Sequence, residues 1–285
     1  CERHIFYLSI CFQDINLRLK AKSLNLKAED YLTGKIKNLN SLEYESQVID
    51  NIKSGTIDEI YLNNTISKKD IFPRKKLSDN SYYVLKNTKK SALIYHDSDE
   101  GNICRIEKTS VSGITPRNAE QAFAIHSLLN EKIPLVSING VAGTGKTLLA
   151  VAAAISQRRN YKQIFVARPI VPLGNKDIGY LPGDISSKIN PYMEPLWDNF
   201  KYIQNQYKET SKEFKVLKNM IESEKLVIQP LAYIRGRSFS NIFFIIDEAQ
   251  NLTPHEVKTI ISRAGENTKI VFAGDINQID TPYLD

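Results

Sequence analysis

The sequence predicts an α/β fold in which helices cover both faces of a parallel sheet. From Gly113 onward, short apolar runs alternate with segments of helical periodicity. The runs are mostly apolar, which is typical of strands buried on both faces of a parallel sheet. One run also leads directly into a glycine-rich loop and then into a helical segment, the order of elements found around phosphate-binding loops.

The expected elements of this part can be placed by residue number. Strands are predicted at 135–139, 163–167, 226–229, 242–246 and 269–273. Helices are predicted at 118–130, 146–157, 213–222 and 254–264. In open sheets of this kind, ligands bind beyond the carboxyl ends of the strands. We therefore expect the functional residues in the segments that directly follow a strand.

The glycine-rich loop after the first of these strands matches the pattern G-x-x-x-x-G-K-[ST], known as Walker A. Its residues are Gly140-Val141-Ala142-Gly143-Thr144-Gly145-Lys146-Thr147. Glycines let successive backbone N–H groups turn toward a phosphate, and the following helix presents its positive end to the anion. Lys146 is expected to reach the β- and γ-phosphates, and the Thr147 hydroxyl is expected to hold Mg²⁺. A glycine turn that fits by chance is the alternative, but the flanking strand and helix favour nucleotide binding.

A pair of carboxylates, Asp247 and Glu248, follows the apolar run Ile242–Ile246 and suits a Walker B site. Asp247 is expected to bind Mg²⁺ through water, and Glu248 to orient and deprotonate an attacking water. The alternative is two exposed carboxylates that cap the helix near Pro254. Because a phosphate-binding loop precedes the pair in the same chain, we predict that the pair is functional.

Gln278 closes the segment Gly274-Asp275-Ile276-Asn277-Gln278 after the last predicted strand. A glutamine in such a place can sense the γ-phosphate or position the hydrolytic water. A simple Gly-Asp turn is the alternative. The candidate catalytic residues are therefore Lys146, Glu248 and Gln278.

Composition and length place the chain among globular proteins. The 285 residues suffice for one large domain or two of ordinary size, with 42% hydrophobic and 25% charged residues. The three cysteines form no C-x-x-C pair, which argues against a disulfide framework and against a zinc site. No apolar run reaches the length of a membrane span and no signal peptide opens the chain, so we expect a cytoplasmic protein. The net charge of +6 permits nucleic-acid contact without requiring it.

Two further regions are predicted before Gly113. Residues 1–32 begin with a strand at 5–10 and continue as a helix at 14–22 with Asp14 as its N-cap, although a carboxylate at this strand end could instead bind a divalent metal. Residues 33–112 are predicted to form a β-rich connector, with strands at 59–62, 82–85, 91–95 and 103–106. Its short basic clusters are expected in solvated loops, with a nucleic-acid backbone as the alternative partner; they are Lys68-Lys69 and Arg74-Lys75-Lys76.

The third predicted domain, residues 113–285, contains the phrases "GITPRNAEQAFAIHSLL", "INGVAGTGKTLLA", "VARPIVPLGNKDIGYLPGD", "AYIRGRSFSNIFFIIDEAQN" and "VFAGDINQIDTPY". Together they resemble the PhoH family, a branch close to superfamily-1 helicase motors with a RecA-like core. The resemblance implies ATP with Mg²⁺ as the ligand, and ATP hydrolysis coupled to RNA unwinding or RNA degradation in the intact protein, with single-stranded RNA as the partner. It also suggests a homo-oligomeric ring. Two alternatives stay open: a P-loop kinase that phosphorylates a small molecule, and an ATP-dependent binding module without hydrolysis.

The resemblance implies roles for residues outside the loop. Gln121, in "RNAEQ", is similar to the glutamine that reads adenine in helicase-type motors; a solvent-facing helix residue is the alternative. Arg235 and Arg237 could grip a phosphate backbone or a neighbouring subunit's nucleotide, with surface ion pairs as the alternative. An arginine that completes the family's active site is expected beyond Asp285. This chain is therefore expected to bind ATP well and to hydrolyse it poorly.

The first region carries a second resemblance. "QDINLRLKAKSLNLKAEDY" resembles the closing part of a PIN nuclease domain, as in PIN–PhoH fusion proteins. The resemblance implies that Asp14 helps to hold Mg²⁺ or Mn²⁺ for RNA cleavage; Asp30 lies in the same phrase without an assigned role. Because the chain opens at Cys1 rather than at a methionine, we expect a fragment whose other acidic ligands lie upstream. One carboxylate cannot hold a two-metal site, so this chain is not expected to cleave RNA by that route.

Overall fold

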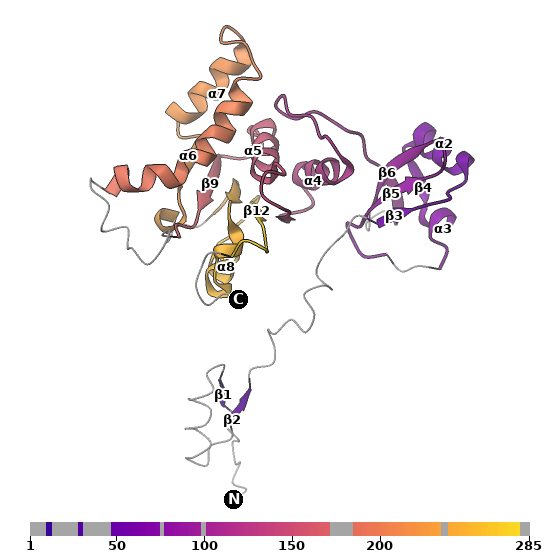
Figure 1. Cartoon of the computed structure of the whole chain (residues 1–285), viewed down its shortest axis with the longest axis horizontal. Coiled ribbons are helices and arrows are strands. Elements are labelled where there is room, and N and C mark those ends of the chain that lie inside the picture. The colour runs from indigo at the N-terminus through magenta and orange to yellow at the C-terminus, as the bar shows by residue number, and fades with distance from the viewer. Residues whose placement is uncertain are drawn as a thin grey trace, which may run out of the picture. The chain divides into compact units, whose positions relative to one another are not determined.

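The computed structural model of the chain describes residues 10–12, 28–30, 47–74, 77–97, 101–171, 185–234 and 239–279 (Figure 1). The chain divides into two compact units, Cys1–Glu45 and Ser46–Asp285. In the first unit, strands β1 (Ile10–Phe12) and β2 (Ala28–Asp30) pair in parallel. Asp14 and its predicted helix lie outside the described residues. The predicted domain boundaries after residues 32 and 112 stay predictions.

The second unit begins with a five-stranded sheet of order β3-β5-β6-β7-β4. β3 pairs in parallel with β5, and the other neighbours are antiparallel. The predicted strands at 82–85, 91–95 and 103–106 are confirmed as β5, β6 and β7. The bounds are β3 Gln47–Ile49, β4 Thr65–Ser67, β5 Tyr82–Lys86, β6 Ser91–Asp97 and β7 Asn102–Arg105. Helix α2 (Ser54–Asn63) connects β3 to β4, and helix α3 (Lys68–Ile71) lies between β4 and β5 in the chain.

The prediction of a strand at 59–62 is wrong, because these residues belong to helix α2. Ile57 and Ile60 are fully buried and lie three residues apart, which is the spacing of one helix face and not of a strand. Asn64, in the left-handed conformation, ends the helix. A four-residue window contains only one of the two buried isoleucines, so its apolar character alone could not distinguish the two structures.

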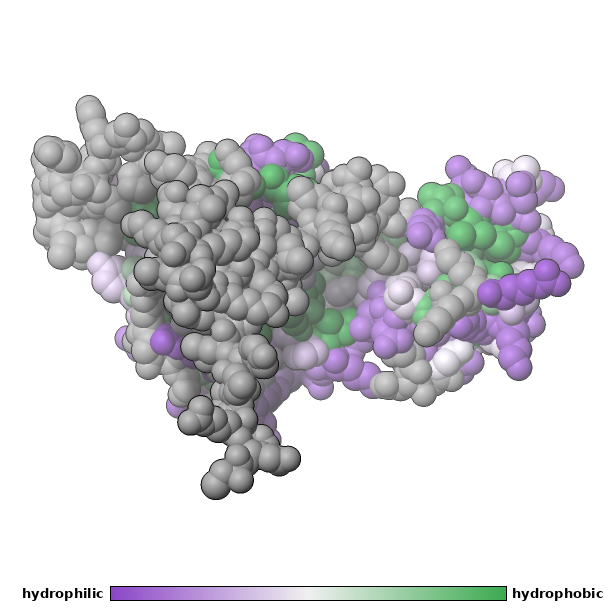
Figure 2. All heavy atoms as spheres, turned by 90° about the horizontal axis from the view of Figure 1, so that it is seen from below, coloured by the Kyte–Doolittle hydropathy of each residue, from purple (hydrophilic) through white to green (hydrophobic). Residues whose placement is uncertain are grey.

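The surface of the described part mixes apolar and hydrophilic side chains, as Figure 2 shows on one face. The exposed apolar residues include Leu62, which is 82% exposed on α2. Scattered side chains of this kind are normal on globular domains. Among the described residues, no helix combines the length and the apolarity that a membrane crossing requires.

The second sheet consists of five parallel strands in the order β10-β9-β11-β12-β8. All five predicted strands of this part are confirmed. Their bounds are β8 Leu135–Asn139, β9 Gln163–Arg168, β10 Leu226–Pro230, β11 Ile242–Ile246 and β12 Lys269–Gly274. Because the strands are parallel, their carboxyl ends meet at one edge, where ligands of such sheets bind.

Helices cover both faces of this sheet, which confirms the predicted fold class. In β11, Phe243 and Ile245 belong to a core shared with α4 to α7, whereas Phe244 and Ile246 belong to a second core shared with α8. Figure 1 shows α4 to α7 gathered apart from α8. The helices are α4 Ala119–Leu129, α5 Lys146–Ser156, α6 Ile185–Gln204, α7 Lys212–Glu222 and α8 Pro254–Ile261, with the short 3₁₀ helices η3 Leu231–Ile234 and η4 Ala249–Asn251.

Two helices differ from the sequence-based prediction. α8 ends at Ile261, three residues before the predicted end at residue 264. Its start is fixed by a capping box at Thr253. α6 was not among the predicted helices. It contains two internal prolines, Pro191 and Pro195, and prolines inside a segment disfavour the prediction of a helix. Among its aromatic residues, Phe200 is buried, Trp197 and Tyr192 pack against the same core, and Tyr202 is half exposed.

Lys269, the first residue of β12, is buried inside the protein with only 1% of its surface exposed. Its Nζ donates hydrogen bonds to the carbonyl oxygens of Ser127, Leu128 and Asn130, at 3.1, 2.9 and 2.7 Å. These carbonyls lie at the C-terminal end of α4, where a cation is favourable. Burial lowers the pKa of Lys269 to about 8. Lys269 thus fixes the end of α4, the helix that carries Gln121 at its other end.

His126 of α4 lies in an aromatic cluster with the first sheet of the unit. Its Nδ1 is 3.1 Å from the hydroxyl of Tyr82, and its ring centroid lies 4.2 Å from that of Tyr95. Burial lowers the pKa of His126 to about 4, with the positive charge of Lys269 acting in the same direction and Asp97 against it. The imidazole is therefore neutral near pH 7 in the folded protein.

We expect the free energy of unfolding to fall as the pH is lowered from about 6.5 to about 4. In this window the unfolded chain binds a proton at residue 126 and the folded chain does not, so acid favours unfolding. The expected loss from this residue is about 1–3 kcal/mol. Chemical denaturation at a series of pH values measures it.

The matched variant is His126→Gln, which keeps a hydrogen-bonding side chain beside Tyr82 and cannot titrate. Its stability should change less over the same pH window than that of the unaltered chain. Parallel pH profiles for the two proteins would show that other groups cause the acid sensitivity.

Candidate nucleotide-binding site

The glycine-rich loop connects the end of β8 to the first residue of α5, as the sequence predicted. Gly145 has φ +84°, a left-handed conformation that favours glycine, and it lies directly before the helix. Lys146 turns back over the loop: its Nζ donates to the carbonyl oxygens of Gly140 at 2.6 Å and Val141 at 3.1 Å. The ammonium group and the amino end of α5 thus face the same loop, an arrangement suited to an anion.

Thr147 and Asp247 meet although they are 100 residues apart in the chain. The Thr147 hydroxyl donates to Asp247 Oδ1 at 2.5 Å, and Asp247 is only 7% exposed. Burial raises the pKa of Asp247, while the Thr147 hydroxyl and Arg168 act in the opposite direction. Hydroxyl and carboxylate oxygens are the ligands that Mg²⁺ prefers. The donor set therefore fits a magnesium ion held by one or two protein oxygens.

Glu248 directly follows Asp247 and has both carboxylate oxygens in hydrogen bonds. Oε1 accepts from Arg168 Nη2 at 2.5 Å, and Oε2 accepts from Gln250 Nε2 at 2.6 Å. The backbone of Glu248 is left-handed, with φ +52°, which is uncommon for a residue with a side chain and recurs at functional sites. Arg168 and Gln250 were not predicted. Arg168 could have been found by its position directly after an apolar strand.

The segment after β12 contacts the loop directly and is connected to Glu248 through Gln250. Asp275 is 3% exposed, and its Oδ2 accepts a hydrogen bond from the Ala142 N–H at 3.1 Å. Gln250 connects this segment to Glu248, since its Oε1 accepts from the Asp275 N–H and its Nε2 donates to the Gln278 carbonyl. Gln278 thus reaches the site through its backbone, and its side chain is exposed. Asp275 is a loop contact that the sequence alone did not identify.

Gln121 lies beside the loop, near the start of α4. Its Nε2 donates to the Thr144 carbonyl at 3.0 Å, and its Oε1 accepts from the Arg117 N–H at 2.7 Å. The Asn118 side chain caps the same helix. The structure therefore brings Gln121 to the glycine-rich loop. Arg235 and Arg237, like Asp14, lie outside the described residues.

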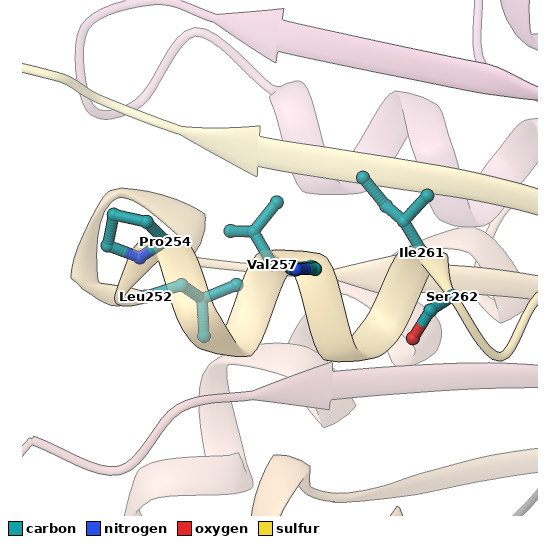
Figure 3. Close-up of a pocket in the computed structure, with 6 residues that line it drawn as sticks. Leu252, Pro254, Val257, Ile261 and Ser262 are labelled. Atoms are coloured by element: carbon teal, nitrogen blue, oxygen red, sulfur yellow. The ribbon is translucent and has the colours of Figure 1, made fainter. Parts of the chain in front are cut away.

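An apolar hollow of about 590 Å³ lies on α8 and the turn before it (Figure 3). Val257 and Ile261, one helical turn apart, extend from the same side of the helix. Its other lining residues are Leu252, Pro254, Lys258 and Ser262. The lining is apolar apart from the Ser262 hydroxyl and the Lys258 ammonium group, and it has no loop of N–H groups that could surround a phosphate. It does not suit a nucleotide phosphate, so the glycine-rich loop is the candidate site.

The chain is similar to known proteins over most of its length. A family described as PhoH-like protein matches residues 113–284. Protein PhoH2 of Bacillus subtilis is 41% identical over 96% of this chain and 62% of its own length. Protein PhoH2 of Thermobispora bispora is 33% identical, over 94% of this chain and 59% of its own. The chain thus spans about three fifths of these relatives.

A shorter relative is matched over more of its length. The PhoH-like protein of Bacillus subtilis is 31% identical over 95% of this chain and 78% of its own. Among solved structures, the UvsW helicase of bacteriophage T4 aligns over 91% of this chain and 69% of its own, with a TM-score of 0.37 and 14% identity. From the family match, the relatives and the glycine-rich loop at the end of a parallel strand, we conclude that the chain belongs to the PhoH family and has the fold of a P-loop NTPase.

Proposed function

We propose that this chain binds ATP with Mg²⁺ at residues 140–147 and hydrolyses it with water. The observation that carries the proposal is the hydrogen bond between Thr147 and Asp247. It joins the phosphate-binding loop to a buried carboxylate, which Glu248 directly follows in the chain. A phosphate cradle, a metal-ligand pair and a second carboxylate are the parts that phosphoryl transfer to water requires.

Each residue then has a distinct proposed role. The loop N–H groups and Lys146 bind the phosphates, and Thr147 and Asp247 hold the metal ion. When bound, Mg²⁺ supplies charge neutralisation at the phosphate oxygens. Glu248 orients the attacking water and accepts its proton. Gln121, beside the loop, is proposed to contact the adenine base.

Hydrolysis is favoured over the two alternatives by the position of Glu248. A kinase would need the same place for an acceptor substrate, and there the structure has a carboxylate held by Arg168 and Gln250. A binding module without hydrolysis would have no use for a second carboxylate beside the metal ligand. Release of phosphate without any added acceptor distinguishes hydrolysis from both.

For the intact protein we propose that ATP hydrolysis drives RNA unwinding or degradation. Membership of the PhoH family and the net charge of +6 support this proposal. A PIN domain with Mg²⁺ or Mn²⁺, a homo-oligomeric ring and a cytoplasmic location belong to the same proposal. An ATPase assay of the full-length protein with and without single-stranded RNA tests it, and turnover unaffected by any RNA would refute the coupling.

Glu248→Gln should lower the turnover of ATP by about 10²–10⁴-fold, because it removes the proposed general base. ATP binding should persist, since the loop, Thr147 and Asp247 are unchanged. Phosphate release and equilibrium binding of a fluorescent ATP analogue measure the two effects. Lys146→Ala is the contrasting variant and should weaken binding itself. An unchanged rate in Glu248→Gln would remove Glu248 from the mechanism.

Gly274→Ala should lower turnover by about tenfold with nearly unchanged ATP binding. A Cβ at residue 274 would lie 2.6 Å from Gln250 Oε1 and 3.2 Å from the Gln250 backbone nitrogen, so the Gln250 side chain must shift. A shift of this side chain would disturb its hydrogen bond to Glu248. Gly55→Ala is the matched control, because a Cβ there has nothing within 4 Å. Equal rates for the two alanine variants would show that the Gln250 contacts do not matter for turnover.

A further inference from the structure

Arg168 is a partly buried cation beside the two carboxylates, and the proposed function gives it no role. Arg168 is the last residue of β9, and the residue before it, Ala167, pairs with Ile246 of β11. The Asp247 N–H also bonds to the Ala167 carbonyl at 2.8 Å, so Arg168 comes directly beside the carboxylate pair. Its side chain is 21% exposed, and that of Glu248 is 30% exposed.

The guanidinium group of Arg168 contacts three groups at once. Nη2 forms an ion pair with Glu248 Oε1 at 2.5 Å, and Nε lies 3.8 Å from Asp247 Oδ2. Nη1 points to the Tyr192 carbonyl of α6 at 3.5 Å. Charge-assisted hydrogen bonds in a partly buried place are stronger than those at the surface. The position of Arg168 is thus set by β9, by α6 and by the carboxylates together.

The side chain of Arg168 contacts the two carboxylates and the Tyr192 carbonyl. It is connected to the glycine-rich loop through Asp247, whose other oxygen accepts a hydrogen bond from Thr147. The shortest of its contacts is the one with Glu248, at 2.5 Å. An effect of Arg168 on phosphoryl transfer is therefore expected through Glu248.

Glu248 is held from two sides. Arg168 approaches one oxygen from the β9 side, and Gln250, which is bonded to the segment after β12, approaches the other. Without Arg168, the carboxylate would have Gln250 as its remaining described side-chain donor and would face the like charge of Asp247. A base that must meet one water molecule gains from being fixed beforehand, because a misplacement of 1 Å can cost about 100-fold in rate.

Building on the proposed ATP hydrolysis, we propose that Arg168 is a positioning residue that aims the Glu248 carboxylate at the attacking water. Arg168 neither binds the nucleotide nor takes a proton. It acts on the rate of the chemical step and leaves the affinity for ATP almost unchanged. If Arg168 instead held Glu248 away from the water, removal of the Arg168 side chain would raise the rate of hydrolysis.

The test compares Arg168→Ala, Arg168→Lys and the unaltered full-length protein. Arg168→Ala should lower kcat about 10- to 100-fold, with KM and the Kd for ATP within about threefold of the unaltered values. Arg168→Lys keeps a cation near Glu248 and should recover part of the rate. Arg158→Ala is the matched control, because Arg158 also bonds a backbone carbonyl, at 3.2 Å, but lies at the end of α5.

A second measurement separates positioning from a loss of folding. Glu248→Asp shortens the carboxylate and moves it out of the reach of Arg168. On this background, Arg168→Ala should cost little further rate, because the pair is already broken. Thermal unfolding of each variant shows whether the fold is kept.

The outcomes are distinct. An equal or higher kcat in Arg168→Ala, a rise in KM that accounts for the whole effect, or full additivity with Glu248→Asp would overturn the positioning role alone. Absence of ATP turnover in the unaltered protein would overturn the proposed function, and the role of Arg168 with it.

Discussion

A buried carboxylate at the end of an apolar strand is the constraint on which the rest of the site depends. Asp247 is 7% exposed, and a buried carboxylate is costly unless it has hydrogen-bond partners. Thr147 supplies one partner at 2.5 Å, which fixes the start of α5 against the end of β11. The loop follows β8 and Asp247 follows β11, and β12 lies between these two strands. The bond therefore depends on the strand order of the sheet. The loop and the carboxylate pair are therefore one structure, although they are 100 residues apart.

Local signals in the sequence predicted the sheet well and the contacts of the site only in part. The five strands were found because each is mostly apolar, and the loop because its glycines and Lys146 have a fixed spacing. The contacts of Arg168, Gln250 and Asp275 depend on which strands are neighbours and in what register. No single stretch of sequence contains that information. The error at 59–62 has a related cause, since the buried pair of α2 extends outside that window.

The contacts around Glu248 form a line across the carboxyl edge of the sheet. It runs from Arg168 at the end of β9, through Glu248 after β11, to Gln250 and then to Asp275 after β12. Asp275 in turn bonds the loop at Ala142. Hydrogen bonds that share partners in this way strengthen one another and respond together to a change. The loop and the carboxylates are thereby connected twice, once through Thr147 and once through this line.

Two adjacent acidic residues are given different environments by this arrangement. Asp247 is deeply buried and bonded to a hydroxyl of the loop, which suits a fixed metal ligand. Glu248 has a left-handed backbone and a side chain that is 30% exposed, between a cation and an amide. Carboxylates that share one site can take separate roles when their surroundings differ. The sequence contains both as a simple pair, and the difference arises from contacts with other segments: Thr147 at the start of α5, Arg168 at the end of β9 and Gln250 in η4. The proposed division into metal ligand and base therefore depends on these tertiary contacts and not on the pair itself.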